Sequence, residues 1–219
     1  MRIPSSLALL TLSAAPLAAQ APRPTAAPAT APAAAVPAPR AFVLDASHTN
    51  VMFKVKHLGI NTVTGRFDKF TGSFTYDSAA PALTSVNVSI DAASVDTDIE
   101  RRDNHLRSED FFFVEQHPVI TFASKNVRRV EGNRFKVLGD LTIRGVTKPV
   151  VLDAELTGLL KLQSGAEVAA VTATTTINRF DYGLAWNRLT EGVANVAPEV
   201  EILLNLEARK AAPTAPAAP

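Results

Sequence analysis

The sequence contains no cysteine, which excludes disulfide bonds, cysteine-based zinc sites, thiol catalysis and an N-terminal lipoprotein anchor. Net charge is nearly absent as well, because the chain carries a formal charge of +1 at pH 7. So small a charge creates no strong field for nucleic acid or for an anionic surface. We therefore expect no nucleic-acid partner and a fold that relies on buried apolar area.

Motifs for catalysis and metal binding are also missing. The histidines show none of the spacings of zinc sites such as HExxH; they are His48, His57, His105 and His117. No serine lies in a GxSxG elbow, and no glycine-rich loop has the Walker spacing. We predict no catalytic residue, no metal and no cofactor.

Both ends of the chain differ in composition from its middle. A positively charged start, the apolar run Leu7–Leu17 and the alanines after it predict a secretory signal peptide over residues 1–19. Residues 20–40 and 211–219 are rich in Pro and Ala, which predicts a disordered linker and a disordered tail. We expect one folded domain over residues 41–210, and export without stable membrane insertion.

Between these ends, apolar and polar residues alternate with a period of two, which is typical of strands with one buried and one wet face. In Val51–His57, for example, Val51, Phe53 and Val55 fall on one face, and Met52 falls on the other with two lysines. The pattern predicts roughly eight mostly antiparallel strands, in a sandwich or a closed barrel. The inward faces carry no charge and include Phe53, Val55, Phe74, Val88, Ile90, Phe122, Leu141, Leu152, Ile177 and Ile202.

The stretch Arg101–Pro118 interrupts this alternation. Its charged first half predicts a short helix near Asp98–Ser108, with Asp98 as the N-cap and Pro118 barring continuation. The phenylalanines of its second half indicate a plug that closes or borders a barrel opening. The residues expected at this opening, or near a ligand head group, are His105, Arg107, Phe111, Phe112, Arg179 and Trp186.

Arg179 belongs to a second break in the pattern, Asn178–Gly183. Arg179 and Asp181 are close enough in sequence to pair, and Gly183 can take a turn conformation closed to other residues. Two interpretations stay open. The segment is either a structural corner or the place where a guanidinium faces an anionic head group.

An enzyme is the alternative to a binding protein. The candidate site lies around Asp103, His105 and Arg107, where a carboxylate–histidine pair can form. Ser47 and His48 are neighbours in the sequence, but adjacency says little about the geometry of a catalytic triad.

Several segments carry a family pattern: Leu44–Phe67 (LDASHTNVMFKVKHLGINTVTGRF), Ile90–Phe122, Gly139–Leu152 (GDLTIRGVTKPVVL) and Thr174–Asn187 (TTTINRFDYGLAWN). In this order they resemble the YceI-like family of periplasmic lipid- and polyisoprenoid-binding proteins. The resemblance implies an all-β, lipocalin-like antiparallel barrel with an apolar lumen.

The same resemblance implies a periplasmic protein that holds a polyisoprenoid or other long-chain lipid, with no catalytic residue to carry over. Composition alone also fits a packed core, and the resemblance favours a lipid-filled cavity. The roles that stay open are carrier, scavenger, store and stress protein, and a homodimer stays possible. The segment Leu156–Val168 departs from the family pattern, so we expect a different rim there.

Overall fold

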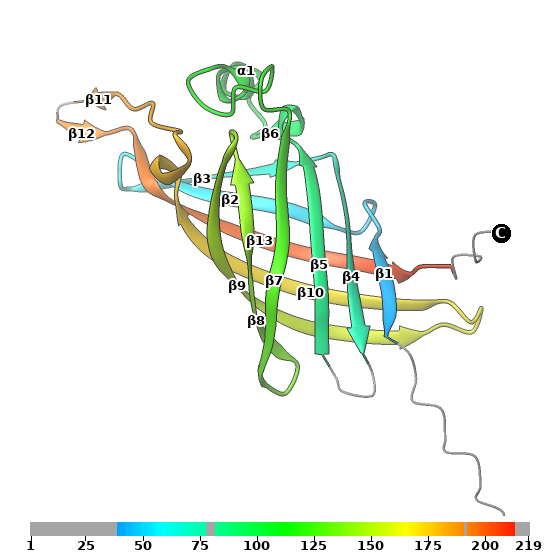
Figure 1. The fold of residues 1–219 in the computed structure, drawn as a ribbon. Helices are drawn as coiled ribbons and strands as arrows, with labels where there is room; N and C mark the ends of the chain where they lie inside the picture. Colours follow the sequence, from blue (N-terminus) through cyan, green and yellow to red (C-terminus); the bar gives the residue numbers. More distant parts are fainter. Residues whose placement is uncertain (1–38, 78–81, 191, 213–219) are drawn as a thin grey trace, which may run out of the picture. The chain divides into compact units, whose positions relative to one another are not determined.

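The computed structural model describes residues 39–77, 82–190 and 192–212 (Figure 1). The predicted signal peptide, most of the linker and most of the tail lie outside the described residues. Strands dominate, as the alternation predicts. In chain order the elements are β1 (Arg40–Leu44), β2 (Asn50–His57), β3 (Asn61–Phe67), β4 (Phe70–Asp77), β5 (Ala82–Asp91), η1 (Ala92–Ser94), β6 (Val95–Asp96), α1 (Glu100–Arg107), β7 (Val119–Glu131), β8 (Arg134–Ile143), β9 (Val146–Lys161), β10 (Glu167–Asn178), η2 (Arg179–Tyr182), β11 (Leu189–Thr190), β12 (Val193–Ala194) and β13 (Val196–Lys210).

The long strands form a closed antiparallel β-barrel. The order around it is β1, β4, β5, β7, β8, β9, β10 and β13, and β1 closes the ring by pairing with both β4 and β13. Phe42 marks the closure, since it lies opposite Phe74 on one side and Lys210 on the other. The prediction of an eight-stranded barrel is confirmed, and the alternative of a sandwich is wrong.

The strands β2, β3 and β6 continue the sheet from the first part of β13. Sequence analysis did not identify β3, because its residues, NTVTGRF, are mostly polar and contain a glycine. Gly65 is required there by packing. A Cβ at this position would lie 2.3 Å from a ring carbon of Phe53, whose aromatic ring covers the glycine.

The helix α1 lies at one end of the barrel, at the top of Figure 1, as expected for a plug. The predicted N-cap is wrong. Ile99 occupies the cap position without a side-chain hydrogen bond. Asp98 instead has a φ of 63°, and its carboxylate accepts a hydrogen bond of 3.1 Å from Arg66. The helix therefore depends on tertiary contacts more than on a local cap.

The end of α1 also differs from the prediction. The helix stops at Arg107, well before Pro118, so the proline is not what ends it. The chain turns back instead, and the backbone N–H of Phe112 donates to the carbonyl oxygen of Leu106 at 2.9 Å. This turn satisfies a free carbonyl at the helix end and leaves Phe111 and Phe112 buried.

The buried hydrophobic residues line the inside of the barrel. Phe42 and Phe74 stack with ring centroids 5.3 Å apart, near the end opposite the helix. Phe122 of β7 lies over Gly139 of β8, where a Cβ would come within 2.4 Å of the ring.

Candidate ligand-binding cavity

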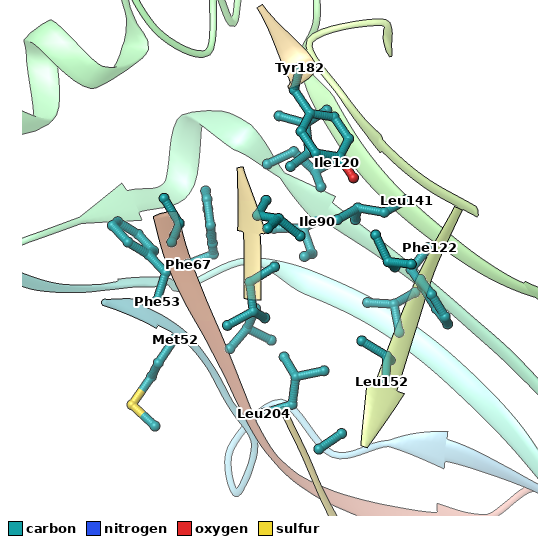
Figure 2. Close-up of a pocket in the computed structure, with 18 of the residues that line it drawn as sticks. Met52, Phe53, Phe67, Ile90, Ile120, Phe122, Leu141, Leu152, Tyr182 and Leu204 are labelled. Atoms are coloured by element: carbon teal, nitrogen blue, oxygen red, sulfur yellow. The ribbon is translucent and has the colours of Figure 1, made fainter. Parts of the chain in front are cut away.

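An apolar cavity of about 180 Å³ lies inside the barrel (Figure 2). Its wall runs from Phe112, below the helix, to Leu83, at the opposite end of β5. The structure places every predicted wall residue in this wall: Phe53, Val55, Phe74, Val88, Ile90, Phe122, Leu141, Leu152, Ile177 and Ile202. Their contact with a lipid stays a prediction.

Other residues of the cavity wall were not predicted from the sequence. Met52 lines the cavity although the alternation assigned it to the wet face. Leu106 comes from α1, and Tyr182 comes from η2. A period of two identifies inward residues only within regular strands, so it gives no signal for Leu106 and Tyr182, and it assigned Met52 of β2 to the wrong face.

Small side chains provide part of the space. Ala154 of β9 lies directly opposite Ala173 of β10, and both residues are buried and line the cavity. Among the described wall residues, Arg179 and Tyr182 alone have polar side-chain atoms. The cavity therefore suits a slender apolar molecule.

Aromatic rings cover the helix end of the barrel. The ring of His105 contacts Phe111 at 5.1 Å and Trp186 at 4.8 Å between centroids, edge to face in both cases. Phe112 contacts Phe67 in the same manner at 5.6 Å. The barrel end at which we expected an opening therefore contains Phe111, Phe112 and Trp186. Through His105 and Phe111, these ring contacts connect the segment around α1 with Trp186, which follows η2.

Arg179 lines the cavity, but its guanidinium is bonded to the protein backbone. Its side chain is 3% exposed, and its guanidinium donates hydrogen bonds to backbone carbonyl oxygens of Leu184, Trp186, Val196 and Ala197. The possible pair with Asp181 does not form, because the guanidinium is directed to backbone carbonyls, and burial lowers the pKa of Arg179. Arg179 therefore fastens the corner, which ends at Gly183 with a φ of 74°, as the structural interpretation required.

The residues of the alternative enzyme site are turned toward separate partners. Asp103 is buried and accepts hydrogen bonds from the backbone N–H and the hydroxyl of Thr97. Arg107 donates to backbone carbonyl oxygens, and His105 lies 2.8 Å from Asp110, not beside Asp103. No carboxylate–histidine–arginine arrangement results from them.

A second polar cluster joins the start of β2 to β13. Asp45, His48 and Glu207 bring one possible ligand atom each within 4.8 Å of one another. The pKa of Asp45 is held well below its usual range, mainly by a hydrogen bond from Ser47 and next by one from Arg209. Ser47 and Asp45 both approach the same Nδ1 atom of His48, so the cluster is not a triad in which a histidine relays a proton between them.

The described residues contain no helix with the length and apolar character needed to cross a membrane.

Comparison with known proteins agrees with this geometry. The profile of the YceI-like domain matches residues 42–208. The chain belongs to the YceI-like family. A UPF0312 protein of Photorhabdus laumondii is 40% identical over 163 residues, which cover 73% of this chain and 80% of the relative. A UPF0312 protein of Yersinia pestis is 38% identical over 163 residues, with 74% and 82% covered.

Solved structures share the YceI-like fold. The YCEI protein of Campylobacter jejuni has a TM-score of 0.65 at 33% identity, covering 73% of this chain and 91% of that one. A polyisoprenoid binding domain from Saccharophagus degradans has a TM-score of 0.58 at 19% identity, covering 78% and 99%. Together the family and the cavity support a YceI-like barrel that acts as a binding protein.

Proposed function

We propose that this protein is exported and holds a long-chain isoprenoid or similar lipid in the barrel cavity. The observation that carries the proposal is a closed barrel around a cavity whose wall is apolar from the helix end to Leu83. Buried water needs several polar partners, and this wall offers almost none. A hydrocarbon chain suits it better.

The energetics favour a chain-like lipid over a compact polar ligand. Removing apolar surface from water stabilises a complex by about 25 cal/mol per Å², before the ordering of the chain is subtracted. A wall without hydrogen-bonding groups selects by length and girth. The name of the Saccharophagus degradans domain, a polyisoprenoid binding domain with the same fold, supports an isoprenoid as the ligand.

The setting that we propose is the periplasm. The predicted signal peptide would direct the chain there, and the Pro/Ala-rich linker would follow it. A protein that shields an isoprenoid from water in this compartment acts as a carrier, scavenger or store.

The test uses protein purified from the periplasm of cells that express the full chain. We expect organic extraction and mass spectrometry to yield about one long-chain lipid per barrel, and stripped protein to take up added prenyl chains. Protein that is lipid-free as purified, and that also fails to take up prenyl chains, would contradict the proposal. Ala173→Phe, which adds bulk inside the cavity, should reduce the lipid content, and Thr174→Phe, which adds the same bulk on the exposed face of the same strand, is its matched control.

A further inference from the structure

Tyr182 has a buried hydroxyl without a partner. The residue is 1% exposed, and its hydroxyl oxygen has no hydrogen-bond partner among the described residues. Buried tyrosine hydroxyls are usually hydrogen-bonded, because an unpaired one destabilises the folded state. A phenylalanine would fill the same space without this cost. The hydroxyl therefore indicates a partner that the polypeptide itself does not supply.

The ring of Tyr182 lies in the wall of the cavity. Figure 2 shows it beside the other lining residues, with its hydroxyl oxygen on the side toward Ile120 and Leu141. The rest of the wall is apolar apart from Arg179, four of whose five N–H groups already donate to backbone carbonyls, so this hydroxyl is the one described side-chain donor of the wall with no partner at all.

Tyr182 also lies at a thin part of the barrel wall. β9 and β10 pair only as far as Asp153 and Thr174, although both strands continue toward the helix end. Beyond that pair, an outer groove has formed between them. Val150, Ile177 and Tyr182 line both this groove and the cavity. A polar group at Tyr182 would thus lie next to the outer surface.

The charges around this point favour an uncharged group. The groove contains one cation and one anion, Lys148 and Asp181, and the guanidinium of Arg179 is engaged by backbone carbonyls. The two charges of the groove cancel, and Arg179, although it keeps its positive charge, directs four of its five N–H groups to backbone carbonyls, so a phosphate would find few free donors here. Burial, together with the negative charge of Asp181, raises the pKa of Tyr182 to about 12, so the hydroxyl keeps its proton and donates at neutral pH.

We infer that Tyr182 donates a hydrogen bond to an uncharged oxygen, an alcohol or a carbonyl, at one end of the bound lipid, where β9 and β10 separate. This inference rests on the proposed function and adds the chemical class of the ligand's polar end. It makes Tyr182 a specificity-determining residue in a wall that otherwise selects by shape.

The test compares Tyr182→Phe with the wild type. Affinities are measured by competition against a fluorescent fatty probe for geranylgeraniol, for the same chain without its hydroxyl, and for the diphosphate of the same chain. We expect Tyr182→Phe to weaken binding of the alcohol about tenfold, the effect of one hydrogen bond, and to leave the hydrocarbon unchanged. Tyr76→Phe is the matched control, because Tyr76 is also buried but does not line the cavity.

Ligand-free Tyr182→Phe should melt at or slightly above the temperature of the wild type, because the removed hydroxyl has no partner in the protein. Equal losses for the alcohol and the hydrocarbon, or no loss for either, would overturn the inference while leaving the proposed function intact. A selective loss for the diphosphate would overturn the assignment of an uncharged oxygen. A wild-type protein that binds none of the three chains would count against the proposed function itself.

Discussion

The substitution Ala173→Phe, which projects a ring into the middle of the cavity, should separate the cavity from an ordinary core. An unfilled space of about 180 Å³ destabilises a protein by about 4 kcal/mol, at about 24 cal/mol per Å³. For a domain of this size, that corresponds to roughly 10 °C in melting temperature. Binding of a lipid should recover much of this difference in the wild type.

In ligand-free protein, the added ring should be stabilising. Its six carbons contribute up to about 5 kcal/mol at about 0.8 kcal/mol each, from which about 1–3 kcal/mol of packing strain is subtracted. We expect a net gain of about 2 kcal/mol and a rise in melting temperature of roughly 5 °C. The same ring excludes the ligand, so added lipid should no longer raise the melting temperature.

The assay is thermal unfolding of stripped and lipid-loaded protein, together with lipid content by mass spectrometry. Thr174→Phe adds a ring to the exposed face of the same strand, so its stability should change by no more than about 0.5 kcal/mol and its lipid content should be normal. A ligand-free Ala173→Phe protein that is destabilised by several kcal/mol would show that the space is absent. Normal lipid content in Ala173→Phe would show that the lipid binds elsewhere.

Further substitutions test the wall, the corner and the polar cluster. In urea titrations, Gly139→Ala should lower the free energy of unfolding by about 1–3 kcal/mol, because the added Cβ would lie 2.4 Å from a ring carbon of Phe122. The control is Gly158→Ala, whose Cβ would have no neighbour closer than 3.9 Å. Arg179→Met should cost roughly 3 kcal/mol or more, since several buried carbonyl groups lose their donor, and an unchanged urea midpoint would refute this. The folded-state pKa of Asp45 is lowered, so its contribution to stability is present above its unfolded pKa of about 4 and is lost as the pH falls below it. Asp45→Asn should therefore flatten the acid limb of the stability curve, and an unchanged limb would contradict that assignment.

Alternation in the sequence was sufficient to identify much of the cavity wall. Every second residue of a barrel strand faces the lumen. Inward residues such as Phe122 on β7 and Leu152 on β9 can therefore be recognised from the alternation in the sequence. The same alternation could not distinguish a packed core from a cavity. That difference depends on small residues such as Ala154 and Ala173 meeting across two strands, and cross-strand register is not encoded locally.

The polar residues were harder to predict, because their partners come from distant segments. Arg179 bonds to backbone carbonyls as far along the chain as Ala197, and a sequence motif gives no sign of such partners. Asp98 has the residue type of an N-cap, yet its carboxylate pairs with Arg66 on β3. Tyr182 lies in a break in the pattern that is visible in the sequence, but only the structure shows that its hydroxyl is buried and has no partner among the described residues.

The most direct measurement is the electron density inside the barrel of protein purified from its own cell envelope. We predict continuous, chain-shaped density along the cavity from Phe112 to Leu83, with its polar end at Tyr182. A lumen in which the side chains have closed together, or one that holds only separate water molecules, would contradict lipid binding.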